Sequence, residues 1–284
     1  MDEYEELYDD KDYRRADTWN IFDHDEDKTL EESMITRINQ YKYMKIANIE
    51  MWASGDSNRW WGGRHRNERD PAYEMFGFDN YYSKHRDTRF EDYGIIPKMI
   101  IVEVRGDVTK SLKMPNFRFT DIVQETWETS QIRKYLTDNR FFFMVYKPDN
   151  QNVLRLMGCQ FWKMPEEDIE QYVHPVWQRT QDVINSGNLW YVDRRGKRHY
   201  YFTNKGENPV CHVRNGAFDN KDTYAMPDGT RCQKRCFALD NKYIEKQIRG
   251  RYRREWVFIK SDGSTAFVAD SRGIKKKDIE KWVR

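Results

Sequence analysis

The chain has 284 residues, enough for one or two domains with their own hydrophobic cores. Aromatic residues make up 15% of it, which excludes a disordered chain because such chains are poor in rings. It contains no apolar run of about 18 residues, so we expect no contact with a membrane. It begins Met-Asp-Glu-Tyr-Glu-Glu, without the apolar region of a secretion signal, so we expect a cytoplasmic protein that keeps its four cysteines reduced.

The net charge of +2 hides a gradient along the chain. Residues 1–32 are strongly acidic, whereas residues 245–284 are strongly basic. An asymmetry of this kind indicates either a nucleic-acid-binding face with an acidic arm or two solvated termini.

The N-terminal third is expected to contain an arm, a helical stretch and a long insertion. Residues 1–28 are acidic and poor in aliphatic side chains, which predicts a loosely ordered arm. Apolar residues at helical spacing from Leu30 to Trp52 predict one or two helices. Residues 53–88 mix glycines with rings and arginines, which indicates a long loop or insertion.

Trp60 and Trp61 stand out within this insertion because arginines surround them. Rings interleaved with cations can stack on the bases of a single strand or on a flipped base. The alternative is that both tryptophans pack the insertion onto the rest of the domain.

The middle of the chain predicts alternating strands and helices. The expected strands cover residues 95–104, 113–119, 140–146 and 153–161, and the expected helices cover 121–136 and a stretch from Pro165 to Gly187. The run Arg-Phe-Phe-Phe-Met-Val-Tyr at 140–146 is apolar almost throughout, which is typical of a central strand buried on both faces.

The C-terminal part predicts shorter elements. Several short strands are expected in residues 189–240, a helix at 241–248, a strand pair at 255–260 and 265–269 around Asp262-Gly263, and a last helix at 275–283. We therefore divide the chain into the arm at 1–28, a main domain at 29–248 and a basic hairpin-helix extension at 249–284.

A series of motifs follows in a fixed order: Gly158-Cys-Gln-Phe-Trp-Lys, Cys211-His212-Val213-Arg214, Lys234-Arg235-Cys236-Phe237 and Asn241-Lys242-Tyr243-Ile244. This order resembles the second half of MutH-type endonucleases, and most of all the C-terminal domain of restriction enzymes of the Sau-three-AI type. The resemblance covers roughly residues 30–248. It implies an α/β fold with a mixed β-sheet flanked by helices, and double-stranded DNA as the partner.

The same resemblance implies that the nuclease site is degenerate. The family's metal-binding Asp and Glu fall on Arg89 and Ile96, while Lys98 keeps the family's lysine and Glu50 keeps a third acidic position. Magnesium is held by carboxylates in near-ideal geometry, so we expect no catalytic residues, no bound metal and no cofactor. The alternative is an active Mg²⁺-dependent endonuclease that uses Glu50, Asp92 and Lys98 in an altered site.

The DNA-reading residues are also carried over from the resemblance. Arg214 matches the family's base-reading arginine, and its forked guanidinium suits guanine in the major groove. Asn215 and Gly216 replace the family's Pro-His, which removes the basis for its GATC preference, and His212 is expected beside the reading loop. Lys234 and Arg235 match a segment close to the DNA backbone and are expected to contact phosphate. Any one of these cations could instead be a solubilising surface charge.

Two further motifs have a structural alternative. Trp127-Glu128-Thr129-Ser130 matches a Trp-Glu-x-Ser segment on a helix of the family. Cys232 and Cys236 have the spacing of a zinc half-site, but Cys211 and His212 are adjacent, which zinc sites rarely show. We therefore expect no zinc.

Together these features predict sequence-selective binding of double-stranded DNA by a degenerate MutH-like domain. Such a domain would be the effector or target-recognition part of a type II restriction endonuclease system, with a catalytic nuclease domain or subunit as its partner. The active endonuclease and a protein-interaction module derived from a nuclease are the alternatives.

Overall fold

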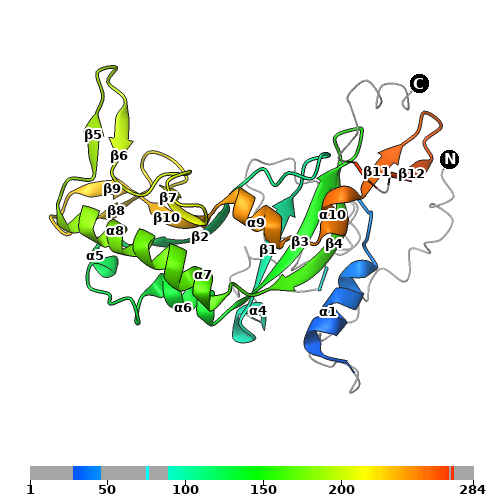
Figure 1. Ribbon diagram of the computed structural model, residues 1–284, viewed down its shortest axis with the longest axis horizontal. Helices are drawn as coiled ribbons and strands as arrows, with labels where there is room; N and C mark the ends of the chain where they lie inside the picture. The colour runs from blue at the N-terminus through cyan, green and yellow to red at the C-terminus, as the bar shows by residue number, and fades with distance from the viewer. Residues whose placement is uncertain (1–27, 46–74, 77–88, 269, 272–284) are drawn as a thin grey trace. The chain divides into compact units, whose positions relative to one another are not determined.

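The computed structural model describes residues 28–45, 75–76, 89–268 and 270–271. They form two compact units (Figure 1). The first contains the described residues up to Gly106, Phe141–Phe161 and those from Arg249 onward; the second contains Asp107–Arg140 and Trp162–Ile248. The α/β class is confirmed. The described strands form two three-stranded and three two-stranded sheets, and the MutH-like arrangement of a mixed sheet stays a prediction.

The first unit is built around a sheet with the strand order β1-β3-β4. Its elements are α1 (Leu30–Asn39), α4 (Arg89–Asp92), β1 (Ile95–Ile101), β3 (Arg140–Pro148), β4 (Leu154–Trp162), α10 (Gly250–Arg254), β11 (Trp256–Ile259) and β12 (Thr265–Val268). The prediction of a buried central strand is confirmed, because β3 lies between β1 and β4 and every residue from Phe141 to Pro148 is buried.

Helix α1 covers part of this sheet. It begins at a capping box, in which the Thr29 hydroxyl accepts from the Glu32 amide and the Glu32 carboxylate accepts from the Thr29 amide. Met34 and Ile38, one helical turn apart, are fully buried and belong to the same core as Phe142 of β3. The apolar spacing that predicted a helix here therefore marks the face that packs.

The chain after Arg249 packs onto the first unit. Strands β11 and β12 pair antiparallel as the sequence predicted, while the helix expected at 275–283 lies outside the described residues. Trp256 is 1% exposed and its indole donates a 2.8 Å hydrogen bond to the Pro148 carbonyl. The ammonium of Lys147 donates to the Arg253 carbonyl at 2.8 Å and to the Ser271 hydroxyl at 2.7 Å. This basic segment is therefore part of a hydrophobic core.

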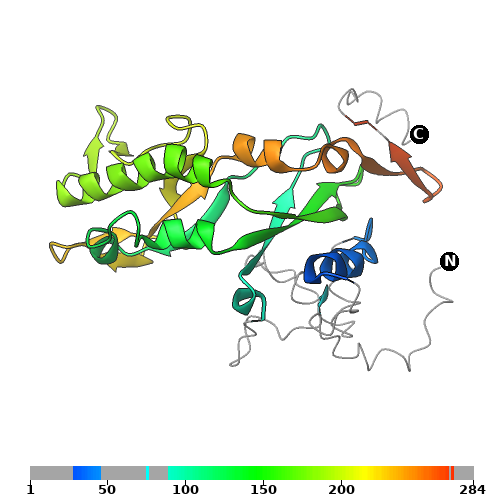
Figure 2. The same ribbon diagram turned by 60° about the horizontal axis from the view of Figure 1, so that its bottom comes forward.

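The second unit has a sheet with the strand order β2-β10-β7, all antiparallel. Its elements are β2 (Leu112–Phe117), α5 (Phe119–Ile122), α6 (Gln131–Thr137), α7 (Glu166–Asp168), the π-helix η2 (Ile169–Val173), α8 (His174–Asn185), β5 (Trp190–Val192), β6 (Arg198–Tyr200), β7 (Cys211–Asn215), β8 (Thr223–Ala225), β9 (Arg231–Gln233), β10 (Arg235–Leu239) and α9 (Asn241–Gln247). Helix α8 runs beside β7 and β10 in both ribbon views (Figures 1 and 2).

The helix predicted at 121–136 is wrong in its middle. Helix α5 ends at Ile122 and α6 begins at Gln131. Between them the hydroxyls of Thr129 and Ser130 bond to the neighbouring backbone, and Ser130 caps α6 by accepting from the Arg133 amide. Hydroxyl side chains compete in this way with helical hydrogen bonds, which favours a turn and a new helix start.

The helix predicted from Pro165 to Gly187 forms with an interruption. It starts as α7, widens into the π-helix η2 and continues as α8, which has a proline in its first turn. A proline inside a helix lacks an amide donor and crowds the preceding turn, so the backbone widens before it. Gly187 follows the helix with a φ of +69°, which confirms the predicted stop.

Candidate nucleic-acid interface

Arg214 lies on the edge strand β7 of the second unit. β7 pairs with β10 alone in this sheet, with Arg214 opposite Cys236. The side chain is partly exposed, and within the described residues its guanidinium makes no hydrogen bond or ion pair. Arg214 therefore carries five donors at a sheet edge and can use them on a ligand.

Hydrogen bonds from both side chains and backbone hold the loop that follows β7. Asn215 Oδ1 accepts from the Ala217 amide at 2.9 Å, and the Gly216 amide donates to the Lys234 carbonyl at 2.9 Å. The Gly216 carbonyl accepts from the Asn116 side chain, and a Cβ on Gly216 would collide with that same side chain. Asn215 therefore supplies an acceptor that this turn uses, and Gly216 supplies the missing Cβ that it needs. These two residues stand where the resemblance places Pro-His.

Lys234 stabilises the same loop through an ion pair. Its ammonium pairs with the Asp222 carboxylate and lies 4.6 Å from the centre of the Tyr224 ring. Asp222 also accepts from the Phe218 amide at 2.9 Å, so this pair fixes the loop on which Phe218 is 73% exposed. Phosphate contact by Lys234 stays a prediction, and it would require the lysine to be shared with Asp222.

Arg235 is 7% exposed, and its guanidinium lies over the Tyr200 ring at 3.7 Å from the ring centre. This geometry is a cation–π contact. The predicted phosphate contact is not favoured by such burial. Arg235 instead joins β10 to the segment that contains Tyr200.

His212 is buried beside Arg214 on β7. It is 3% exposed, and within the described part of the chain its Nδ1 has no hydrogen-bond partner. Burial lowers the pKa of His212, although Asp240 opposes the change, so the ring is neutral near pH 7. A neutral, buried ring favours a packing role beside Arg214 on β7 over a DNA contact.

The predicted nuclease positions lie in the first unit. Arg89 begins the short helix α4, and Ile96 and Lys98 lie on β1 with 4% and 8% exposure. Glu50 falls outside the described residues, as do Trp60 and Trp61. No three His, Cys, Asp or Glu side chains gather as a metal site in the part of the chain that the structure describes.

The four cysteines are buried as free thiols. Burial raises the pKa of the Cys211 thiol to about 12, and burial also raises the pKa of Cys232. Zinc binds thiolates, which such apolar surroundings disfavour.

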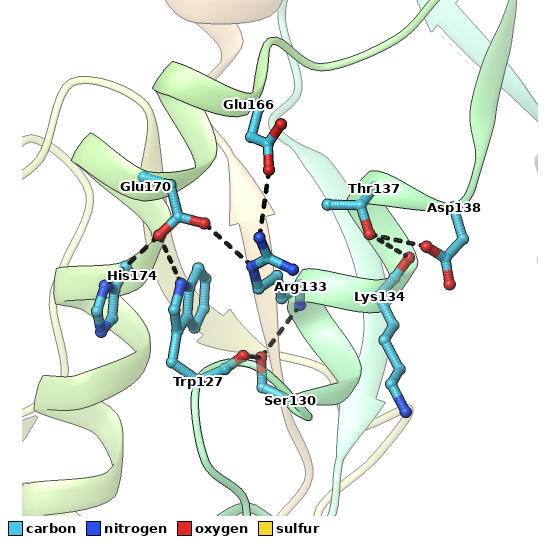
Figure 3. A network of polar contacts seen from close by, with 9 residues as sticks. All are labelled: Trp127, Ser130, Arg133, Lys134, Thr137, Asp138, Glu166, Glu170 and His174. Atoms are coloured by element: carbon cyan, nitrogen blue, oxygen red, sulfur yellow. Dashed lines mark hydrogen bonds and ion pairs between the residues drawn. The ribbon is translucent and has the colours of Figure 1, made fainter.

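In the Trp-Glu-x-Ser motif, Glu128 and Thr129 are exposed, whereas Trp127 and Ser130 are buried and join a polar network (Figure 3). The Trp127 indole donates to Glu170 at 2.6 Å, and Arg133 donates to the other oxygen of that carboxylate at 3.0 Å. The His174 ring stacks on Trp127 with centres 4.4 Å apart and planes 3° apart. Because Glu170 lies in η2, the motif anchors the π-helix to the start of α6.

Sequence reasoning expected short strands in residues 189–240 but did not single out the hairpin of β5 and β6 as a candidate site. Its strands, Trp-Tyr-Val in β5 and Arg-His-Tyr in β6, carry exposed rings. The turn that joins them is Asp193-Arg-Arg-Gly-Lys. Aromatic residues on both sides of a glycine-containing turn are a signal of a hairpin, and the basic residues at its tip were a second signal.

One curated relative is similar to this chain: the type II restriction enzyme Sau3AI of Staphylococcus aureus, at 27% identity over 191 residues. The match covers 56% of this chain and 39% of the enzyme, so the chain spans well under half of the relative's length. No family model matches. The similarity supports a restriction-endonuclease-related family and a function connected with DNA.

Among the described residues, no helix is both long and apolar enough to cross a bilayer.

Proposed function

We propose that the second unit binds double-stranded DNA in a sequence-selective way, as the target-recognition part of a restriction endonuclease system. The catalytic nuclease would then be another domain or subunit. The observation that supports this most is Arg214, a partly exposed arginine on an edge strand whose guanidinium is not used by other described residues. The similarity to a restriction enzyme supplies the reason to expect DNA as its ligand.

The neighbours of Arg214 support this role by holding their own shape. A reading side chain needs a backbone that is fixed before DNA arrives, since ordering it during binding costs free energy. The pairing of Lys234 with Asp222 and the turn at Gly216 provide this rigidity. In this proposal Lys234 and Arg235 position β7, the reading strand, and Arg214 contacts bases.

Arg214→Ala is expected to weaken binding to the preferred sequence by about 1–3 kcal/mol and binding to random duplexes only slightly, because a bidentate contact to guanine is lost. The preferred sequence would be selected from a random duplex pool, with a GATC-containing duplex measured in parallel. The matched control is Lys221→Ala, an exposed cation of the neighbouring loop, which should weaken both duplexes alike. Equal losses on both duplexes for Arg214→Ala would show that it does not read bases.

The first unit is expected not to cleave DNA, because Ile96 occupies a ligand position and both Ile96 and Lys98 are buried. Supercoiled plasmid incubated with the protein and Mg²⁺ or Mn²⁺ should stay intact. Nicking that survives purification and disappears in Lys98→Met, a variant of similar side-chain length, would instead support the altered endonuclease. Circular dichroism of the variant separates loss of activity from loss of fold.

A further inference from the structure

The β5–β6 hairpin carries four cations within five residues: Arg194, Arg195, Lys197 and Arg198, all exposed. Within the described residues, the first three make no side-chain hydrogen bond or ion pair, and Arg198 lies over the Trp190 ring at 4.5 Å from its centre. The tip therefore presents cations that form no ion pair with described residues of the second unit. Figure 1 shows the hairpin standing clear of the other elements of the second unit.

The carboxylate at the tip, Asp193, makes its hydrogen bonds within the hairpin. Asp193 Oδ1 accepts from the amides of Arg195 and Lys197 at 2.9 Å each, and Oδ2 is hydrogen-bonded to His199 Nε2 at 2.8 Å. The His199 bond and these amides hold the pKa of Asp193 below its usual range. Gly196 completes the turn with a φ of +76°. Asp193 thus fixes the tip without an ion pair to any of its arginines.

Aromatic side chains stiffen the two strands. The Tyr191 ring stacks on His199 with centres 5.2 Å apart and planes 15° apart, and it also meets Tyr201 at 5.3 Å. Trp190 meets Tyr200 edge to face at 6.0 Å. An isolated two-stranded hairpin is marginally stable in water, and cross-strand ring pairs of this kind are what stabilise one. The hairpin therefore keeps one shape although it is largely exposed.

The base of the hairpin is tied to the reading strand. Tyr200 stacks on Phe202 at 6.1 Å with planes 8° apart, and the buried guanidinium of Arg235 lies over its ring. Arg235 lies directly opposite Asn215, the residue after Arg214. The Val213 amide also donates to the Thr203 carbonyl at 2.8 Å. Arg235 thus acts as a strut that fixes the hairpin relative to Arg214.

We infer that the β5–β6 hairpin is a second DNA contact, a rigid arm whose tip binds phosphates beside the sequence read by Arg214. This inference rests on the proposed function. Duplex DNA fits because it offers closely spaced phosphates along its length, and a turn whose backbone is already fixed holds the arginines and the lysine close together before they bind. The tip adds salt-dependent affinity, while sequence selectivity stays with Arg214.

The test compares three proteins, the unaltered chain and two variants, on the preferred duplex and on a random duplex. The tip variant is Arg194→Ala/Arg195→Ala/Lys197→Ala, and the charge-matched control removes three exposed lysines of the same unit, Lys134→Ala/Lys163→Ala/Lys246→Ala. Dissociation constants are measured for the whole chain at salt concentrations from about 50 to 200 mM. All six side chains are exposed, and circular dichroism checks that each fold is intact.

The tip variant is expected to lower the slope of log affinity against log salt by about 2–3 units and to weaken binding about 10- to 100-fold at the lowest salt, since about three phosphate contacts are lost. The control should change the slope by less than about one unit. Both variants should keep the ratio of preferred to random binding.

Three results would overturn the inference in distinguishable ways. If the tip variant keeps the slope and affinity of the unaltered protein while Arg214 still reads DNA, the hairpin is not a DNA contact. Its cations would then bind an acidic protein surface instead. If the lysine control loses as much affinity and slope as the tip variant, the effect comes from the total charge of the unit and not from the hairpin. Failure of the unaltered protein to bind any duplex overturns the proposed function and, with it, the arm.

Discussion

Gly158→Ala is expected to destabilise the first unit by more than about 3 kcal/mol, because two separate costs combine at this position. Gly158 has a φ of +145°, a conformation that residues with a Cβ rarely adopt and that costs about 1–3 kcal/mol. A Cβ there would also lie 2.5 Å from a ring carbon of Tyr252. Overpacking of a buried ring costs about a further 1–3 kcal/mol.

The Tyr252 ring cannot easily move aside. It is 1% exposed, and its hydroxyl donates to the Cys159 carbonyl at 2.8 Å while it accepts from Arg251 at the same distance. The matched control is Gly263→Ala, in the turn between β11 and β12. Gly263 has a φ of +82° with no atom within 4 Å of an added Cβ, so it tests backbone strain alone at about 1–2 kcal/mol.

Hydrogen exchange of the β3 and β4 amides measures the stability of the first unit separately from the second. Equal losses for Gly158→Ala and Gly263→Ala would mean that the contact with Tyr252 is not tight. The comparison matters because Gly158 begins the first of the motifs on which the family resemblance was based. Its role in the structure is to let helix α10 approach strand β4.

The predictable parts of the fold were those set by local pattern. The run Phe141–Phe143 predicted a central strand because a segment apolar on both faces must be covered on both faces, and Asp262-Gly263 predicted a hairpin because the turn type demands such residues. The break between α5 and α6 was missed, since hydroxyl capping by Ser130 competes with an apolar pattern that continues through it.

The chemistry of the candidate site was less predictable because it depends on partners distant in sequence. The sequence placed Lys234 and Arg235 together as phosphate ligands, but Lys234 lies between β9 and β10 whereas Arg235 begins β10, and successive residues of extended backbone point to opposite sides. The partners of each side chain therefore depend on tertiary structure. Lys234 meets Asp222, and Arg235 meets Tyr200. The segment after Arg249 was likewise predicted from its charge, whereas its buried tryptophan decides where it packs.

Trp256→Ala is expected to destabilise the first unit by about 3–5 kcal/mol, the usual cost of removing a buried large ring. Trp256 is 1% exposed, and truncation also leaves the Pro148 carbonyl at the end of β3 without its 2.8 Å hydrogen bond. The backbone around it supplies acceptors at 2.8 and 2.9 Å, the Arg253 and Glu255 carbonyls, to the buried ammonium of Lys147. Movement of this segment would therefore leave a buried charge with fewer partners.

The matched control is Trp256→Phe, which keeps an aromatic ring and loses the indole donor, and it should cost about 1–3 kcal/mol. Hydrogen exchange of β3 amides again reports on the first unit, and DNA binding at low salt reports on the second. If the segment after Arg249 were a loosely attached basic extension, Trp256→Ala would leave β3 exchange unchanged and reduce only DNA affinity. If it is part of the core, β3 exchange accelerates because the sheet loses the ring that covers the end of its central strand.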